Sequence, residues 1–387
     1  MDARVEARAS APRAVDLRRG RAPDIEIVDC ATYDFLLSLD VTLSATESGY
    51  EEYDIGRAWI ERARAACDRH APGALETLGR YFGDARPSSL RATLISLIGQ
   101  RAEPPDTQRF LDWLAEAPAA DLIETLLDQD GLGPEWPALL RAALEERASA
   151  PEREPGPASL RLLDLYPREA RPTALRVLHE IESVRAELIA ALRGWYESVF
   201  AEEEERLIPL LKREAEMMAL RRADTPQDVF VEREMRGVQW QRPAGLRRII
   251  FAPSYFCKPA VFYHFWRGTL TFCPPVEAVS PGSSGPRMDP AAPAEETLRF
   301  FEALGDDTRL RILRLLAGRE MYLTELADRL GLTKATTKHH MVRLRAAGIV
   351  TLYDRERLTY YALRPDVARR ATHLLDTLIS APGDGRP

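Results

Sequence analysis

The sequence is poor in cysteine and has no long apolar run, and each absence argues against a class of protein. Its four cysteines, Cys30, Cys67, Cys257 and Cys273, lie far apart without a C-x-x-C pair. This spacing argues against a disulfide framework or a zinc ribbon, so we expect reduced and mostly buried thiols. No stretch reaches the roughly 18 apolar residues that a membrane span needs, and the first 23 residues lack the apolar core of a signal peptide. We therefore expect a cytoplasmic protein without a membrane partner.

The motifs of common enzymes are missing as well. The sequence has no nucleophile elbow, Walker loop, dinucleotide-binding fingerprint or H-E-x-x-H motif. We therefore predict that the protein is not an enzyme and holds no cofactor. Two alternatives stay open at this point: an enzyme with an appended C-terminal module, and an adaptor that binds another protein.

Composition divides the chain, which at 387 residues is too long for one ordinary core. We expect a flexible tail over residues 1–23, a helical body over residues 24–276, and a linker dense in Pro, Gly and Ser over residues 277–293. Residues 294–380 hold 15 Lys and Arg against 12 Asp and Glu, a balance of +3, whereas the remainder holds 38 against 48, or −10. A mildly basic module on an acidic body fits a DNA-binding protein with a separate regulatory domain.

The body combines helical periodicity with one aromatic segment. After a short β-like run, IEIVDC, Pro and Gly separate segments with the period of a helix, so we expect stacked helical hairpins. A long helical stretch follows over residues 171–222, and its acidic run EEEER, residues 202–206, is most simply a solvated face. Residues 228–274 are rich in aromatic and β-branched side chains, with Arg267 and Gly268 at a hairpin turn. This segment predicts a small sheet.

The aromatic segment is the candidate sensor of the body, because its side chains could line a pocket for a flat or apolar ligand. The residues of this candidate pocket are Tyr255, Phe256, Phe262, Tyr263, Phe265 and Trp266. The alternative is that they form only the core of the strands. Cys257, His264 and Cys273 could join a fourth group around zinc, but their spacing fits no familiar pattern, and we predict no metal.

The C-terminal module carries a succession of helix signals. Asp306 is placed to cap a helix whose apolar stripe is Leu310, Leu313 and Leu316. In the next segment, YLTELADRLGL, Gly331 is placed for a helix C-cap. The tight turn GLT then leads into TKATTKHHMVRLRAAGIV, so the two segments predict a helix-turn-helix.

The second helix of this pair has two unlike faces. At about 100° per residue, the face that must pack holds Thr337, Met341, Leu344 and Gly348. The opposite face holds Ala335, His339 and Val342, flanked by Lys334 and Lys338. Hydrogen-bond donors in the first turns suit a helix whose N-terminal half enters the major groove of DNA.

A hairpin and a last helix complete the module. IVTLY and LTYYAL flank a charged tip, so we predict a wing that lays Arg355 or Arg357 along the DNA backbone or minor groove; a solvated tip is the alternative. The last helix begins with Pro365 in its first turn. Its apolar stripe consists of Val367, Ala371, Leu374 and Leu378. Because such an exposed stripe needs a partner, we predict a two-fold homodimer through helices at residues 295–304 and 365–380.

These motifs, in this order, resemble the winged helix-turn-helix regulators of the ArsR/SmtB family. LGDDTRLRILRLL is similar to the second-helix motif of the family, TKATTKHHMVRLRAAGIV to its recognition helix, and YDRERLTYYAL to its wing. The resemblance covers under a quarter of the chain. It implies base contacts by Lys334, Ala335, Lys338 and His339. It implies phosphate contacts by Thr333, Thr336 and Arg355, and Arg357 at the wing tip completes the predicted DNA-binding set. His340 is expected to be a structural hydrogen-bonding residue.

The sequence also departs from the metal-sensing members of that family. Those members carry a cysteine pair where this sequence has MYLTEL, and His373 stands alone on the last helix, so we predict no metal in this module. The predicted fold is mainly α: a helical body with a small β-sheet segment, plus a C-terminal winged helix-turn-helix. The predicted function is a sequence-specific transcriptional repressor that binds double-stranded DNA. Its body would sense a non-metal signal, such as a small-molecule effector, or bind a partner.

Overall fold

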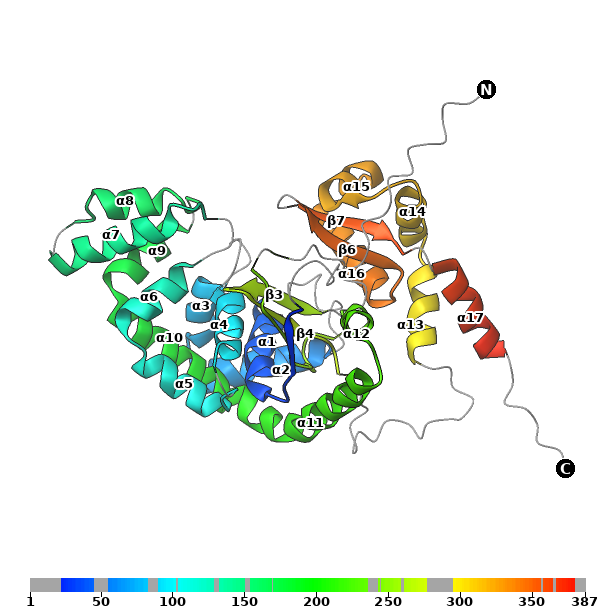
Figure 1. Cartoon of the computed structure of the whole chain (residues 1–387), viewed down its shortest axis with the longest axis horizontal. Helices are drawn as coiled ribbons and strands as arrows, with labels where there is room; N and C mark the ends of the chain where they lie inside the picture. Colours follow the sequence, from blue (N-terminus) through cyan, green and yellow to red (C-terminus); the bar gives the residue numbers. More distant parts are fainter. Residues whose placement is uncertain are drawn as a thin grey trace, which may run out of the picture.

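The computed structural model describes residues 22–44, 55–82, 90–101, 104–128, 132–149, 154–168, 170–235, 243, 245–258, 261–276, 295–355, 358–364 and 367–379. The predicted linker and nearly all of the predicted tail lie outside these residues, so both stay predictions. Residues 22–276 supply the body, with many helices and one sheet, and residues 295–379 supply a smaller unit, the winged-helix module (Figure 1). The predicted fold class, mainly α with small sheets, is confirmed.

The helices of the body begin and end where the sequence supplies caps and breakers. They are α1 (Ala31–Ser44), α2 (Arg57–His70), α3 (Ala74–Phe82), α4 (Leu90–Gly99), α5 (Thr107–Glu116), α6 (Ala119–Leu127), α7 (Trp136–Ser149), α8 (Pro157–Leu163), α9 (Arg171–His179), α10 (Ile181–Trp195), α11 (Ala201–Ala223) and α12 (Gln227–Glu234). Asp106 caps α5 by accepting a hydrogen bond of 2.8 Å from the backbone N–H of Arg109. Pro157 and Pro172 lie in the first turns of α8 and α9. The backbone N–H groups of a first turn have no partner within the helix, so proline, which lacks this N–H, costs no hydrogen bond there.

A long helix dominates the second half of the body. α10 and α11 are joined without a break by a π-helical turn, η2 (Tyr196–Phe200). A break at Glu180, where φ is −118° and ψ is 35°, separates α10 from α9. The helical stretch predicted over residues 171–222 is therefore confirmed, with one interruption.

A four-stranded sheet runs through the body in the order β1 (Asp24–Ile27), β2 (Arg248–Phe251), β4 (Thr269–Cys273) and β3 (Phe262–Trp266). β2 lies parallel to both β1 and β4, and β3 pairs antiparallel with β4. Arg267 and Gly268 connect β3 to β4 with φ values of 47° and 82°. Two successive positive φ values are what a tight two-residue hairpin needs, so the predicted turn is confirmed.

One part of the predicted β segment is a helix. Residues 228–234, DVFVERE, belong to α12, so the prediction of a strand there was wrong. Phe230 and Val231 are buried, and Glu234 is buried beside them with a 2.9 Å ion pair to Arg221 of α11. These positions share one helix face, and the packing of that face outweighs the β preference of valine and phenylalanine.

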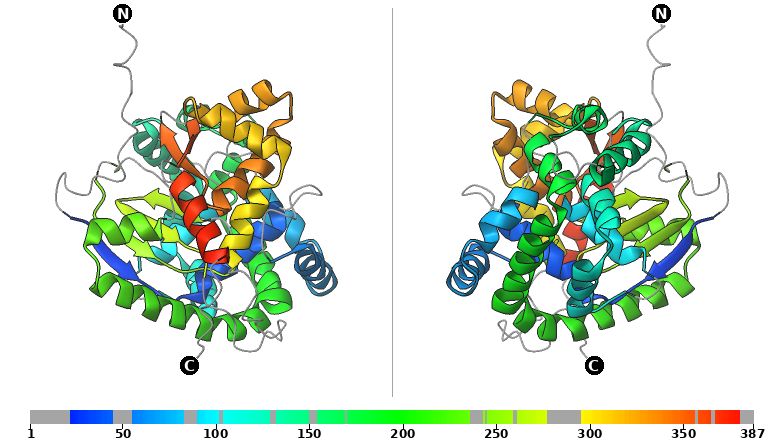
Figure 2. Two further views of the ribbon diagram at one scale, coloured as in Figure 1. Left: turned by 90° about the vertical axis from the view of Figure 1, so that its right-hand side faces the viewer. Right: turned by 90° about the vertical axis from the view of Figure 1, so that its left-hand side faces the viewer.

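The sheet lies between two helical layers. On one side α4 covers the sheet and α1 packs against α4; both helices join the large apolar cluster of the body, which includes Phe256 and Trp266. On the other side Met218 of α11 and Phe230 of α12 pack against the sheet, in one apolar cluster with Ile249 of β2. Figure 2 shows α11 running beneath the strands. The sheet is therefore buried on both faces, as its largely parallel pairing requires.

A buried carboxylate fastens α1 to the segment after β2. Asp34 is fully buried and accepts hydrogen bonds from the hydroxyl of Ser254 and from the backbone N–H groups of Tyr255 (3.1 Å) and Phe256 (3.2 Å). Burial raises the pKa of Asp34 to about 6, because the three donors only partly offset the loss of solvation. This carboxylate joins two parts of the body that are far apart in sequence.

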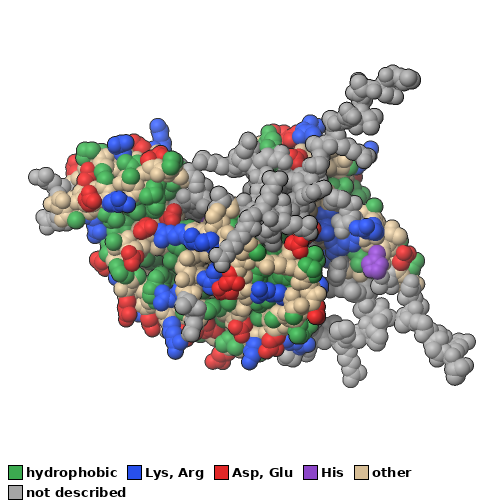
Figure 3. Space-filling view, in the orientation of Figure 1, with side chains coloured by type: hydrophobic (Ala, Val, Ile, Leu, Met, Phe, Trp, Pro, Cys, Tyr) green, Lys and Arg blue, Asp and Glu red, His purple; other side chains and the backbone are tan. Residues whose placement is uncertain are grey.

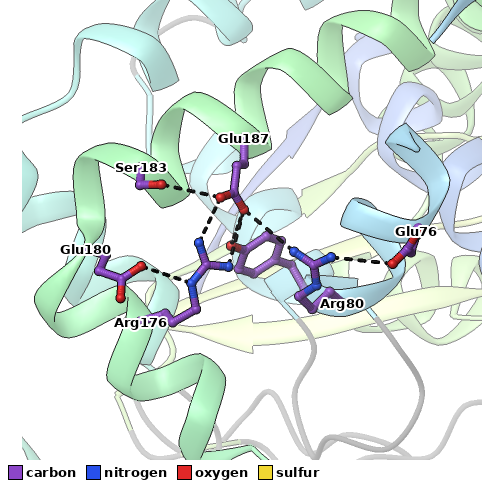
Figure 4. A network of polar contacts seen from close by, with 7 residues as sticks. Glu76, Arg80, Arg176, Glu180, Ser183 and Glu187 are labelled. Carbon is purple, nitrogen blue, oxygen red and sulfur yellow. Dashed lines mark hydrogen bonds and ion pairs between the residues drawn. The ribbon is translucent and has the colours of Figure 1, made fainter. Parts of the chain in front are cut away.

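Carboxylates also fasten the long helix to its neighbours. Glu187 on α10 accepts hydrogen bonds of 2.8 and 3.3 Å from Arg176 on α9 and lies 3.7 Å from Arg80 on α3 (Figure 4). Hydrogen bonds from Arg176 lower the pKa of Glu187.

The run EEEER is more than a solvated face, which corrects the simplest interpretation of its sequence. Glu203 accepts a hydrogen bond of 2.7 Å from the indole of Trp59. Glu204 accepts bonds of 2.5 Å from Thr107 and 2.8 Å from Tyr196. These contacts join the first turn of α11 to α2, to α5 and to the π turn.

The winged-helix module has its own core. Its elements are α13 (Glu295–Leu304), α14 (Asp307–Leu316), β5 (Met321–Tyr322), α15 (Leu323–Leu330), α16 (Lys334–Ala346), β6 (Val350–Arg355), β7 (Leu358–Leu363) and α17 (Val367–Ile379). The core, which we call the winged-helix core, is built around Phe300, Ile312, Met341 and Leu344. The stripe predicted for α14 is corrected in part: Leu316 is buried, but Leu310 is 45% exposed and Ile312 takes the inner position.

Candidate nucleic-acid interface

The turn between α15 and α16 is fixed by its two caps. Gly331 ends α15 in the left-handed conformation, with φ 69°, and the N–H of Leu332 donates to the carbonyl of Ala327 at 3.0 Å. Thr333 caps α16, because its hydroxyl accepts a bond of 3.1 Å from the N–H of Thr336. The C-cap predicted at Gly331 is confirmed. These caps hold the two helices as a helix-turn-helix.

α16 presents one buried face and one exposed half. Thr337, Met341 and Leu344 are buried in the module, as predicted. The exposed side chains lie at the start of the helix and just before it: Thr333, Lys334, Thr336 and Lys338. Gly348 was predicted to share the packed face, but it lies beyond the helix with φ 64°, where Arg370 approaches it. Glycine adopts this left-handed conformation at no steric cost, unlike residues with a Cβ.

His339 and Arg343 form a pair on α16. His339 is half-buried, and its Nε2 accepts a hydrogen bond of 3.3 Å from Nε of Arg343. Because Nε2 accepts, a neutral His339 carries its proton on Nδ1. The sequence reasoning did not include Arg343, although its spacing of four residues from His339 on a helix is a signal that could have found it.

His340 connects α16 to α14. Its Nδ1 lies 3.6 Å from Oδ1 of Asp306, which caps α14 by accepting a bond of 2.8 Å from the N–H of Arg309. Burial lowers the pKa of His340, and the carboxylate of Asp306 opposes that shift. The buried Nδ1 of His340 makes no hydrogen bond to the described residues, so its predicted hydrogen-bonding role stays a prediction. The predicted N-cap at Asp306 is confirmed.

The wing follows directly from α16. β6 and β7 pair antiparallel, and Arg355 lies opposite Leu358, next to the tip. The predicted hairpin is therefore confirmed, and β5 adds a third strand beside β7. Arg357 lies outside the described residues, as do the side chains of Arg355 and Ala335, so the DNA contacts predicted for these three stay predictions.

The first and last helices of the module expose apolar side chains. α13 and α17 pack against each other, and Leu374 is buried between them and the core. Leu298, Leu378 and Ile379 remain 47%, 44% and 70% exposed. The stripe predicted on the last helix is therefore divided: one part serves the module's own core, and the other faces outward.

The six residues of the candidate ligand pocket do not gather on one side of the sheet. Phe256 and Trp266 are buried in the cluster on the α1 and α4 side, and Tyr255 and Phe262 pack against the same cluster. Tyr263 and Phe265 face the opposite side, with α11 and α12. Trp266 donates a hydrogen bond of 2.7 Å to Asp128. Strand core accounts for these positions, and the pocket stays a prediction.

The cysteines and His264 are largely buried in the body. All four cysteines are free; Cys67, Cys257 and Cys273 are buried, and burial raises the pKa of Cys30 to about 11. His264 lies 2.7 Å from the hydroxyl of Ser96 through Nδ1. Within the ranges given above, no group of three or more His, Cys, Asp or Glu side chains could hold a metal ion.

Charged side chains of both signs cover the visible face of the body, where acidic and basic groups are interspersed (Figure 3). Among the described helices, none combines the length and the apolar character that crossing a membrane requires. The exposed donors at the start of α16 are the candidate surface for nucleic acid.

Comparison with known proteins agrees with this geometry. The helix-turn-helix domain family matches residues 304–353. The uncharacterized HTH-type transcriptional regulator MJ1325 of Methanocaldococcus jannaschii is 34% identical over 85 residues, which are 22% of this chain and 96% of that protein. The transcriptional repressor SdpR of Bacillus subtilis is 31% identical over 67 residues, 17% of this chain and 74% of SdpR. The arsenic resistance transcriptional regulator ArsR1 of Pseudomonas putida is 33% identical over 82 residues, 21% of this chain and 64% of ArsR1.

The family match lies inside the module, where two helices, a tight turn, a recognition helix and a wing follow in order. The relatives extend over most of their own length but over a quarter or less of this chain, so the likeness concerns the module and not the body. Through this C-terminal module, the chain belongs to the ArsR/SmtB-like family of winged helix-turn-helix transcriptional regulators.

Proposed function

We propose that the protein is a cytoplasmic, dimeric repressor that binds specific double-stranded DNA through α16 and the wing. The observation that carries the proposal is the exposed start of α16. Lys334, Thr336 and Lys338 are exposed there, while Thr337, Met341 and Leu344 anchor the other face in the core. A helix held in this way presents its first turns to a major groove.

The residues of this surface divide into two proposed roles. Lys338 is exposed on α16 and His339 is half-buried beside it; both would read base edges, with Arg343 holding the imidazole of His339. Thr333 and Thr336 lie at the helix start and would contact phosphates, as would Arg355 at the end of β6. Phosphate contacts fix the register of the helix on DNA, and base contacts select the sequence.

The outward side chains of α13 and α17 support the proposed dimer. Leu298, Leu378 and Ile379 are exposed on helices that already pack together within one chain. A second copy that covers them around a two-fold axis would bring two α16 helices to two half-sites of an operator. Repression is the proposed outcome, and the likeness to the repressor SdpR supports it. The body would sense a small-molecule effector or bind a partner.

Fluorescence anisotropy tests the DNA-binding part. The full chain is titrated into duplex DNA from upstream of its own gene, with excess random competitor and over a series of salt concentrations. We expect competitor-resistant binding, and the Lys338→Ala variant should lose about 1–3 kcal/mol on the specific duplex and less on random DNA. Lys212→Ala is the matched control, because Lys212 is an exposed lysine on α11 of the body.

Three results would contradict the proposal. Equal losses for Lys338→Ala on specific and random DNA would remove its role in reading bases. Equal binding by wild type, Lys338→Ala and Lys212→Ala on all DNA would favour the alternative in which the winged helix binds protein. Turnover of a metabolite that depends on body residues would instead favour an enzyme with a winged-helix appendage.

A further inference from the structure

β3 is the outermost strand of the body sheet, and one of its residues contacts two cores. Among the described strands, β3 pairs with β4 alone. Tyr263 packs against the apolar cluster between the sheet and α12, and it also packs against the winged-helix core. Phe265 lies on the same face two residues later and packs against the first cluster without belonging to the second. On this face of β3, Tyr263 therefore contacts the winged-helix core and Phe265 does not.

We propose that Tyr263, on the outermost strand β3, forms a docking surface on which the body holds the winged helix of its own chain. A half-buried tyrosine suits this position, because its ring supplies apolar area while its hydroxyl tolerates water at the rim. The docked module still exposes Lys334 and Lys338 on α16, so docking orients the proposed DNA-binding surface without covering it.

A row of aromatic rings leads from this surface into the body. Tyr263 stacks on Phe272 of β4, with ring centroids 6.3 Å apart and planes at 24°. Phe272 meets Phe251 of β2 edge-on at 5.6 Å, and Phe251 meets Phe230 of α12 edge-on at 5.4 Å. Packed rings have few alternative arrangements, so a change at α12 or in the sheet would alter the position of Tyr263. This row is the physical route by which the state of the body would reach the orientation of the winged helix.

Photo-cross-linking tests the contact directly. Tyr263→p-benzoylphenylalanine and Phe265→p-benzoylphenylalanine variants of the full chain keep an aromatic ring at each position. After irradiation and digestion, we expect position 263 to link to peptides from residues 295–379 within one chain, and position 265 to link to body peptides. Links from both positions to the body alone would overturn the proposal. So would links from position 263 that join two chains.

Hydrogen exchange gives a second, independent measurement. Loss of one aromatic packing contact should speed exchange in the winged-helix core roughly two- to tenfold in Tyr263→Ala, and Phe265→Ala should leave that exchange unchanged. Equal rates in the winged-helix core of both variants would contradict docking through Tyr263. If Tyr263→Ala does not fold, the cross-linking variants still decide the question.

The coupling of docking to operator binding rests on the proposed function, so the two variants are also titrated with DNA. We expect Tyr263→Ala to change the affinity for the specific duplex and Phe265→Ala to leave it near wild type. If the wild-type protein binds no specific DNA, the proposed function fails, while cross-linking and exchange still test the docking surface. If DNA binding is present and identical in both variants, docking does not control it.

Discussion

Neutralising Asp34 is expected to change how the stability of the body depends on pH. Asp34 is fully buried, and burial raises its pKa from 3.8 in an ordinary aspartate to about 6. The native state therefore binds a proton more tightly than the unfolded state does. The stabilising contribution of this proton is complete below about pH 4 and is lost as the pH rises through 6. A shift of about two units corresponds to roughly 3 kcal/mol over the whole range.

The Asp34→Asn variant has no ionisable group at this position and can still accept from Ser254 and Phe256 through its carbonyl oxygen. Between pH 5 and pH 7.5, the free energy of unfolding of the wild type should fall by about 1–1.5 kcal/mol relative to that of the variant. Urea unfolding followed by tryptophan fluorescence measures this difference in the body, because all six tryptophans precede Arg267. Asp121→Asn, at an exposed position on α6, is the control.

The reasoning would be refuted by a parallel pH dependence in wild type and Asp34→Asn. That result would mean that Asp34 is ionised in the native state at pH 5, so that the three hydrogen bonds outweigh burial. A pH dependence that changes equally in Asp121→Asn would show that the effect comes from the general charge of the chain.

Four further predictions concern single residues. Gly331→Ala should destabilise the winged-helix module by about 1–2 kcal/mol, because φ is 69° and an L residue is strained in this conformation. The added Cβ meets no neighbouring atom within 4 Å, so the strain comes from the backbone alone. Calorimetry would detect the loss, and an unchanged melting temperature would contradict it. Glu187→Gln should cost less than about 1 kcal/mol and lose its effect at high salt, because the carboxylate is 36% exposed; urea unfolding at two salt concentrations checks this. Arg355→Ala should weaken binding to all duplexes nearly equally and reduce the slope of log affinity against log salt by about one unit in anisotropy titrations. Ile379→Asp should shift the proposed dimer toward monomer in sedimentation experiments, since the side chain is 70% exposed on α17; an unchanged oligomeric state would contradict an interface at this position.

The features that the sequence predicted correctly are mostly local. Asp306 and Gly331 cap their helices within a few residues of their own position, and the Arg267–Gly268 turn needs only its two flanking strands. The order of helices and wing in the module could be predicted because each signal lies beside the next along the chain. The exposed start of α16 was predictable for the same reason.

The features that the sequence did not predict depend on contacts between distant segments. Asp34 meets the segment after β2 across more than two hundred residues, and no local pattern marks that partnership. α12 was predicted as a strand because its valine and phenylalanine favour β-structure. Its packing against α11, where Glu234 pairs with Arg221, could not be predicted from the local sequence. The aromatic segment was interpreted as one candidate pocket, although alternation along β3 sends its rings to opposite faces.

The π-helical turn between α10 and α11 determines the angular phase of the long helix. At 100° per residue, the buried stripe of α11, with Leu207, Leu211 and Met218, would point about 100° away from the stripe of α10, with Leu188 and Leu192. A π turn takes up one extra residue and so rotates α11 back by about the same angle. The sequence has the pattern of a regular helix into which a single residue has been inserted. This turn restores the alignment of the two buried stripes. The same side of one long helix therefore packs in the helical core over α10 and against the sheet near the end of α11.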